Sequence, residues 1–273
     1  MRSPQRKVCM ASRVATLGRW IFTAFSGALA VSAVAANVPP GLQPPGGLEP
    51  DQTPQIIVMT FDDAVTASTF ETVQSILTNR CNPNGTPVQA TFFVSTDWTD
   101  YARVQRLYAA GHEIALHTMT HTTGTNTDLA TWRAEIAGCR RTLSRLARIP
   151  LEDIRGFRAP FLQYSHESFY ILNEQGLTYD ASICERPGRL SQSASQMLWP
   201  YTLDNGVAQD CWTGTPPQTN IPGLFEMPLW SLYDTNTSEC VTMDPSGSDA
   251  QVLALLQYNF LARYNGNRAP LGI

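Results

Sequence analysis

The sequence lacks an excess of positive charge, internal repeats and closely spaced cysteine pairs. It contains 19 basic and 23 acidic residues, and five of the basic residues lie within the first 19 positions, where there is no acid. The chain after residue 36 is therefore acidic, with a net charge of about −9. This balance argues against nucleic acid or an anionic membrane as the partner, and it suits a neutral or amine-bearing substrate. None of the six cysteines is spaced like those of a zinc knuckle.

Residues 1–36 have the pattern of a secretory signal peptide. Their basic start is followed by an apolar run from Trp20 to Ala36, which ends in small residues. The alternative is a single membrane anchor, because a run of 17 residues lies at the lower edge of what spans a bilayer. The run is rich in Ala, Ser and Gly, which favours cleavage after Ala35 or Ala36. We therefore expect a secreted protein, extracellular or in the cell wall, without membrane attachment.

Cleavage would remove one cysteine, Cys9, and leave five. In a secreted protein most of these should form disulfide bonds. The odd count leaves one cysteine that is free, bridges two chains or pairs with a partner beyond residue 273. The five are Cys81, Cys139, Cys184, Cys211 and Cys240.

Short apolar runs alternate with amphipathic segments after a Pro- and Gly-rich linker or arm at residues 37–54. The runs predict strands at 55–63, 88–95, 112–116, 154–157, 177–183, 198–202 and 224–230. Helical spacing predicts helices at 68–79, 101–110, 128–147, 166–175 and 248–263. This alternation predicts an α/β fold, a distorted (β/α) barrel with seven or eight mainly parallel strands that closes on itself.

The first predicted strand is an apolar run that ends in two adjacent carboxylates, Asp62 and Asp63. Two neighbouring acids repel each other, so keeping both ionised in a partly buried place requires a cation. His117 and His121 are four residues apart and would lie on the same side of one helical turn, from which both can reach a single metal ion. A carboxylate from another strand end would complete three protein ligands, with water in the fourth position.

The positions of these motifs strengthen this interpretation. The acids end one predicted strand, the histidines follow another and Arg158 follows a third, so a barrel would bring them all to the same mouth. Taken singly, an acid pair is most often a solvated turn, two histidines are more often surface or core residues, and Arg158 could be a surface ion-pair partner. The chain has only four histidines, however, and two of them form this pair.

Three motifs, in this order, resemble those of the polysaccharide deacetylases, carbohydrate esterase family 4: Thr60-Phe61-Asp62-Asp63, His117-x-x-x-His121 and Arg158-x-Pro160-Phe161. A closer likeness to the animal-type chitin deacetylases lies in Trp199-Pro200-Tyr201-Thr202-Leu203-Asp204 and in Pro222-Gly223-Leu224-Phe225-Glu226-Met227-Pro228. The resemblance extends over the whole chain after the linker. It implies that residues 55–273 form a polysaccharide deacetylase catalytic domain.

The resemblance also implies the metal site. Asp63, His117 and His121 would hold a divalent metal, usually zinc, with cobalt or another divalent ion as an alternative. The ion would lower the pKa of its bound water and polarise the acetamide carbonyl.

Three further residues are implied to act in catalysis. Asp62 would be the general base, and Arg158 would hold it by a charge-assisted hydrogen bond. The backbone N–H of Phe161 would share the negative charge of the tetrahedral intermediate with the metal. The family often has Tyr at this position, but a backbone donor tolerates the change to Phe.

The family's last motif, a Leu-x-His on the final strand, has no complete match. The chain ends in Ala269-Pro270-Leu271-Gly272-Ile273, which resembles the residues that precede this histidine. We therefore expect the sequence to stop a few residues short of the domain's C-terminus. Otherwise the general acid for the departing amine is missing, at a cost of about 10²- to 10⁴-fold in rate.

The sequence thus predicts an enzyme, a metal-dependent polysaccharide deacetylase that acts as a monomer. It would hydrolyse the N-acetyl groups of chitin or chito-oligosaccharides, releasing acetate and leaving glucosamine units. A weak or inactive carbohydrate-binding protein on the same scaffold is the alternative from another class. Peptidoglycan and acetylxylan are alternative substrates, because the metal site does not distinguish acetyl carriers.

Overall fold

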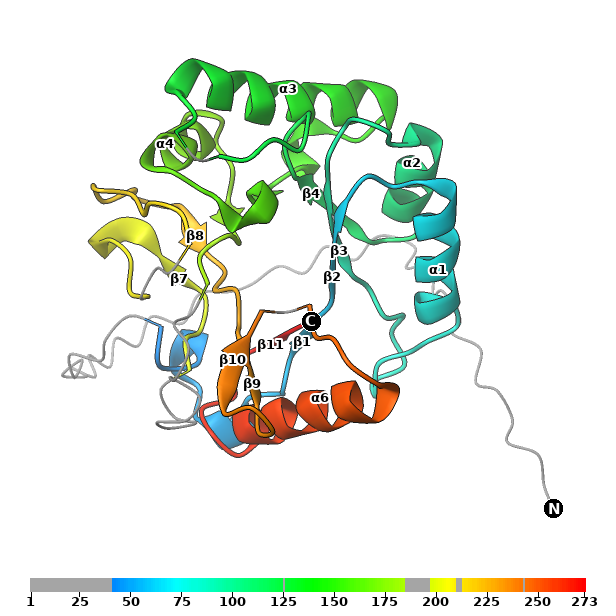
Figure 1. Ribbon diagram of the computed structural model, residues 1–273, viewed down its shortest axis with the longest axis vertical. Coiled ribbons are helices and arrows are strands. Elements are labelled where there is room, and N and C mark those ends of the chain that lie inside the picture. Colours follow the sequence, from blue (N-terminus) through cyan, green and yellow to red (C-terminus); the bar gives the residue numbers. More distant parts are fainter. Residues whose placement is uncertain (1–40, 125, 185–196, 210–212, 243) are drawn as a thin grey trace, which may run out of the picture.

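A mainly parallel sheet of seven strands forms the centre of the molecule (Figure 1). The computed structural model describes residues 41–273 except 125, 185–196, 210–212 and 243. Neighbouring strands are parallel apart from the last pair, β8 and β7. In sheet order they are β2 (Thr60–Asp63), β3 (Thr91–Val94), β4 (Glu113–Leu116), β5 (Gly156–Phe157), β6 (Tyr179–Asp180), β8 (Phe225–Glu226) and β7 (Tyr201–Thr202).

The distorted, mainly parallel α/β barrel predicted from the sequence is confirmed, but its closure is not. Among the described residues, β2 and β7 are the two ends of the hydrogen-bonded ladder. The outer edge of β2 meets the C-terminal residues instead, because the N–H of Thr60 donates to the carbonyl of Ile273 at 2.8 Å. The prediction of a closed barrel was therefore wrong for this ladder, since a different strand occupies the edge that β7 would need.

Two small sheets complete the strands. β1 (Ile57–Val58) pairs in parallel with β11 (Leu271–Gly272), so the single strand predicted at 55–63 is divided into β1 and β2. β9 (Leu232–Asp234) and β10 (Glu239–Val241) form an antiparallel hairpin that the sequence pattern did not indicate.

Helices surround the sheet, with α1 and α2 on one side, α3 and α4 on another and α6 opposite α3 (Figure 1). Several begin at a residue whose side chain caps the first turn: Asp100 accepts from the backbone of Ala102 and Arg103, and Asp128 accepts from Thr131. All five helices predicted from the sequence are present: α1 (Ala67–Leu77), α2 (Tyr101–Ala109), α3 (Leu129–Leu146), α4 (His166–Glu174) and α6 (Asp249–Tyr264).

The main core lies between the sheet and α1 to α4. Strands β3 and β4 are its centre, because nearly all of their side chains are buried. Apolar helix faces cover them, including Trp132 and Ile136 of α3. Trp199 and Tyr201, which belong to one of the motifs that carry the family resemblance, are both buried. His112 is also buried, and its Nδ1 accepts a hydrogen bond from the N–H of Ala90 at 3.2 Å, which is a structural role.

The described part of the predicted linker or arm, from residue 41, contacts the domain. The carbonyl of Leu42 accepts a hydrogen bond from the side chain of Asn267 at 2.9 Å, and the carbonyl of Gly41 accepts one from the N–H of Trp199. The predicted signal peptide, residues 1–36, lies outside the described residues. Within the described part of the chain, no helix has the length and apolar character needed to span a bilayer.

One of the described cysteines belongs to the core. Cys139 is a free thiol, completely buried under β3, and its sulfur lies 3.4 Å from the carbonyl oxygen of Val94. Burial raises the pKa of this thiol to about 12, so Cys139 is an inert core residue.

Candidate metal centre

A cleft of about 560 Å³ lies at the carboxyl ends of the parallel strands and contains every site residue that the sequence predicted. These residues come from the end of β2, from the segment after β4 and from the segment after β5. They are Asp62, Asp63, His117, His121, Arg158 and Phe161.

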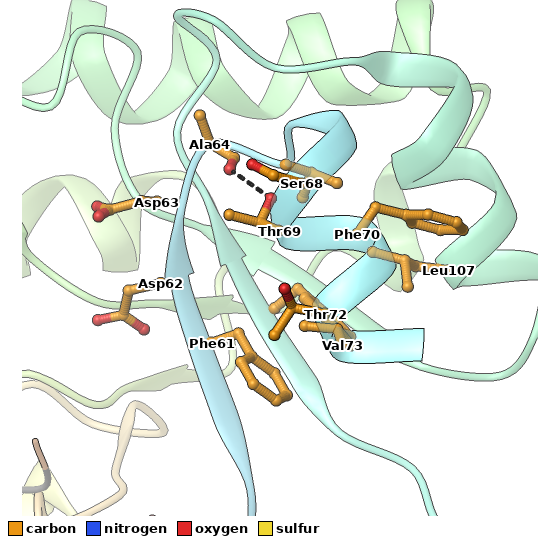
Figure 2. A pocket seen from close by; sticks show the side chains of 12 residues that line it. Phe61, Asp62, Asp63, Ala64, Ser68, Thr69, Phe70, Thr72, Val73 and Leu107 are labelled. Atoms are coloured by element: carbon orange, nitrogen blue, oxygen red, sulfur yellow. Dashed lines mark hydrogen bonds between the residues drawn. The ribbon is translucent and has the colours of Figure 1, made fainter. Parts of the chain in front are cut away.

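Both acids of β2 face this cleft, although successive side chains of a strand normally point to opposite faces. The reason is the backbone of Asp63, whose φ of 78° lies in the left-handed region and interrupts the alternation. Figure 2 shows the two carboxylates on one side of β2 and the ring of Phe61 on the other, toward α1. That ring is stacked on Phe92 with the centroids 5.1 Å apart, which anchors the strand end in the core.

Asp63, His117 and His121 form a group that could hold a metal ion. One ligand atom from each lies within 4.8 Å of the others. Oδ1 of Asp63 is 2.8 Å from Nε2 of His121 and 3.5 Å from Nε2 of His117. The neighbouring side chains, His117 first and then His121, lower the pKa of Asp63, so its carboxylate stays ionised.

The surroundings of His117 suit a residue that coordinates a metal ion. The ring is 2% exposed, and Nδ1 lies 2.8 Å from the carbonyl oxygen of Arg158, to which it donates its proton. The lone pair is then on Nε2, which points toward Asp63. Metal-binding histidines in proteins commonly have their second nitrogen held in this way.

The two histidines do not lie on a helix, as the sequence pattern had suggested. Residues 117–121 form an irregular segment in which Thr118 and His121 have φ values of 67° and 54°. A regular helix would require negative φ at both positions. The histidines converge because the left-handed residues turn the chain back over the end of β4, so the prediction of a helical turn at this position was wrong.

Glu135 of α3 stabilises this segment. Its carboxylate is nearly buried and accepts hydrogen bonds from the N–H of Met119 at 2.7 Å, the N–H of Thr120 at 3.0 Å and the hydroxyl of Thr120 at 2.9 Å. Sequence reasoning missed this residue. The available signal was an acid on the apolar face of a helix, next to Ile136, where a charge requires a partner.

Arg158 holds Asp62 from within the core. Its side chain is almost fully buried. Its Nη1 donates to Oδ1 of Asp62 at 2.7 Å and to the hydroxyl of Thr60 at 3.0 Å. Nε donates to the carbonyl of Ala181 at 3.0 Å, and the guanidinium lies 4.1 Å from the ring centroid of Phe93. The contacts leave the arginine little freedom, so Asp62 has a charged partner of fixed position.

Phe161 forms part of the rim next to His121. Its side chain is 63% exposed, and its ring lies edge-on to that of His121 with the centroids 4.8 Å apart. The backbone has a φ of 55°, which is uncommon for a bulky residue. Among the described residues, none accepts a hydrogen bond from the backbone N–H of Phe161.

Two further acids that the sequence analysis did not assign lie behind Arg158. Asp180 and Glu226 are fully buried and face each other in the register of β6 and β8. Burial raises the pKa of Asp180 to about 6. The hydroxyl of Ser182 donates to Asp180 and accepts from the N–H of Ala159, both at 2.8 Å, so this pair is linked to the peptide that follows Arg158.

An acid held by a buried arginine, beside a ligand set of two histidines and one carboxylate, can support metal-assisted hydrolysis. Its place at the carboxyl ends of parallel strands is where α/β barrels carry their active sites. The fold and the site together therefore define an α/β protein with a candidate metal-binding, hydrolytic centre.

Comparison with known proteins gives the family. Residues 49–179 match the polysaccharide deacetylases. The chain is 37% identical to chitin deacetylase 8 of Bombyx mori over 84% of this chain and 61% of that protein, and 31% identical to chitin deacetylase 1 of Bombyx mori over 84% and 44%. The chain contains a polysaccharide deacetylase domain, and it spans less than two thirds of the length of both relatives.

Solved structures of two further proteins are similar at lower identity. A family 4 carbohydrate esterase from Streptomyces lividans in complex with acetate has a TM-score of 0.40 and 17% identity, over 69% of this chain and 97% of that one. The Xyl-CE4 domain of a multidomain xylanase from the hindgut metagenome of Trinervitermes trinervoides has a TM-score of 0.38 and 22% identity, over 65% and 88%.

Proposed function

We propose that this protein hydrolyses N-acetyl groups of chitin or chito-oligosaccharides in a metal-dependent reaction, giving acetate and glucosamine units. The observation that carries the proposal is the hydrogen bond of 2.7 Å between buried Arg158 and Asp62, beside the three clustered ligand groups. The identity to two proteins named chitin deacetylases supports chitin as the substrate.

Asp63, His117 and His121 would hold the metal, which we propose to be zinc, with cobalt as a substitute. Two imidazoles and one carboxylate are the ligand set of many catalytic zinc sites, and the exposed side of Asp63 leaves room for water and substrate. A bound divalent ion would supply a Lewis acid for the acetamide carbonyl and would acidify water.

Asp62 would take the proton from the attacking water. A general base has to be within reach of its proton, and the buried guanidinium of Arg158 fixes one oxygen of the Asp62 carboxylate by a hydrogen bond. The second oxygen of Asp62 can then accept the proton. Arg158 is itself held by Thr60 and Ala181, so it cannot follow a displaced carboxylate.

The backbone N–H of Phe161 would donate to the carbonyl oxygen as negative charge develops on it. A preorganised donor of this kind stabilises a transition state more than a mobile one does. The left-handed backbone of Phe161 turns this part of the chain at the rim, where the acetyl group of a substrate would lie.

We further propose that the protein is secreted, with disulfide bonds, and acts as a monomer on an N-acetylated polysaccharide outside the cell. The pattern of residues 1–36 supports this location. The negative charge of the remaining chain suits a substrate that becomes cationic as acetyl groups leave.

Acetate release tests the proposal. The secreted protein would be stripped of metal and then incubated with zinc or cobalt and with a chitin pentamer, peptidoglycan or acetylxylan. We expect acetate from the pentamer only after a metal is restored. Faster release from another polymer would overturn chitin as the substrate. Binding of the pentamer without acetate from any polymer would identify a carbohydrate-binding protein on this scaffold instead.

A further inference from the structure

A groove of about 440 Å³ lies along α3, at the periphery of the molecule, and shares no lining residue with the cleft of the metal centre (Figure 1). Its α3 residues recur every three or four positions, at 134, 138, 141 and 145, so they form one face of the helix. The residues of this α3 groove that matter below are Ala134, Gly138, Arg141, Arg145, Leu146 and, from the histidine segment, Met119.

Gly138 allows Met119 to lie directly on the helix. A Cβ at position 138 would overlap Sδ of Met119, so any larger residue there would displace the methionine. The backbone of Met119 is fixed: its N–H donates to Glu135 at 2.7 Å, and its carbonyl accepts from the N–H groups of Thr96 and Asp97 at 3.2 and 3.0 Å. The groove thus has a fixed wall whose flexible thioether can adapt to an apolar side chain of a partner.

The arginines of α3 fall into two groups. Arg133 pairs with Glu174 of α4 at 2.6 Å, and Arg140 donates to two backbone carbonyls, so both of these side chains are held inside the protein. Arg141 and Arg145 line the groove and are exposed, and neither makes an ion pair or a hydrogen bond with another described residue. The groove therefore presents two guanidinium groups whose donors are available to a partner.

The stability of α3 explains only one of these two cations. A cation in the last turn of a helix offsets the helix dipole, which accounts for Arg145. Arg141 lies before the last turn of a helix that ends at Leu146, where the effect of the dipole has fallen off. Because the chain after residue 36 is acidic, two neighbouring cations without a described counter-ion reverse its charge locally and attract an anionic partner.

We infer that the α3 groove is a docking surface for an acidic segment of a partner protein that carries an apolar side chain next to Asp or Glu. Arg141 and Arg145 would each take a carboxylate in a charge-assisted, two-pronged hydrogen bond. Leu146, which is 57% exposed, and half-buried Met119 would cover the apolar side chain. Met and Arg are both enriched in protein interfaces. A sulfated polysaccharide would use the arginines alone and would leave the apolar part of the groove without a partner.

The first test is the binding of a fluorescently labelled peptide of alternating Glu and Leu to the purified protein, measured by anisotropy. We expect Arg141→Glu to raise the Kd by about 10-fold or more, because an attracting pair becomes a repelling one. Arg141→Gln should give a smaller rise. Arg268→Glu makes the same change of charge as Arg141→Glu, next to α6 on the opposite side of the molecule, and is the matched control. Equal changes in Arg141→Glu and the control, or no binding by the wild-type protein, would overturn the inference.

The second test separates the apolar contact from the charge. Leu146→Ser should raise the Kd for the same peptide by about 5-fold, because the contact of one leucine side chain is lost. Leu253→Ser removes a leucine of matching exposure, 56%, from α6 and should leave the Kd unchanged. A peptide of alternating Glu and Ser should bind more weakly than the Glu and Leu peptide. If heparin bound in an Arg141-dependent way and the Glu and Leu peptide did not bind, the groove would belong to an anionic polysaccharide and the inference would fail.

Discussion

The two walls of the cleft are held in different ways. On one wall, His117 and Arg158 are buried, and hydrogen bonds to other elements hold both of them, with Glu135 holding the histidine segment from behind. On the other wall, Thr242 and Asp244 follow β10; Asp244 is exposed, and neither side chain hydrogen-bonds to another described residue. Burial therefore preorganises the wall that carries the candidate catalytic residues, whereas the wall with Thr242 and Asp244 can adjust to a bound substrate.

The largest loss of activity should come from removing a candidate metal ligand. His117→Ala or His121→Ala would leave two ligand groups of the three, so we expect loss of both metal and activity. Metal content of the purified protein and acetate release would be measured on the same sample. Retention of stoichiometric metal in both variants would mean that the ion binds elsewhere. His166→Ala is the control, because His166 lies on α4, outside the cleft.

Asp62→Asn should separate binding from chemistry. The amide keeps the shape of the side chain and removes its basicity, so we expect metal content to stay unchanged and kcat to fall by about 10²- to 10⁴-fold. Steady-state rates at saturating pentamer would measure this loss. Unchanged turnover would show that another group accepts the proton.

Glu135→Gln tests whether the buried carboxylate that holds the histidine segment contributes to metal affinity. The amide cannot accept from all three donors, so the segment from His117 to His121 should lose its fixed geometry, and metal affinity should fall by about 10- to 100-fold. Competition with a chelator would measure the affinity. Glu174→Gln is the matched control, because Glu174 pairs with Arg133 in an exposed place. A similar affinity in both variants would contradict the role of Glu135.

Asp180 should make stability depend on pH. Burial raises its pKa from 3.8 to about 6, so between these values the folded protein keeps a proton that the unfolded chain has lost. This contribution is complete below about pH 4 and is lost as pH rises through about 6, a decrease of about 3 kcal/mol. Asp180→Asn should flatten the profile. Urea unfolding at several pH values would measure it, and an identical profile for the two proteins would rule out this source.

The smallest effect should come from the opposite wall. Asp244→Asn removes a charge from an exposed side chain that no described residue holds, so we expect kcat for the chitin pentamer to change by less than about 2-fold. Steady-state rates at saturating pentamer would test this. A loss as large as that of Asp62→Asn would show that both walls take part in the chemistry.

The sequence predicted much of the fold because its signals are local. The helices and the main parallel strands follow from apolar spacing and capping residues within short segments, and all five predicted helices were found. The β9–β10 hairpin was missed, since its strands are three residues long and depend on packing against α6. The closed ladder was also wrong, because the pairing of β1 with β11 joins residues more than two hundred positions apart.

The candidate site also has features that local sequence predicts and features that depend on tertiary contacts. The sequence by itself determined the residue types and their order, since acids at a strand end, paired histidines and an arginine can be recognised from local spacing. Only the tertiary structure decided that Asp63 turns back to face the same cleft as Asp62 and that Glu135 holds the histidine segment. These features depend on contacts between elements that are distant in the chain, and such contacts override local preferences of the backbone.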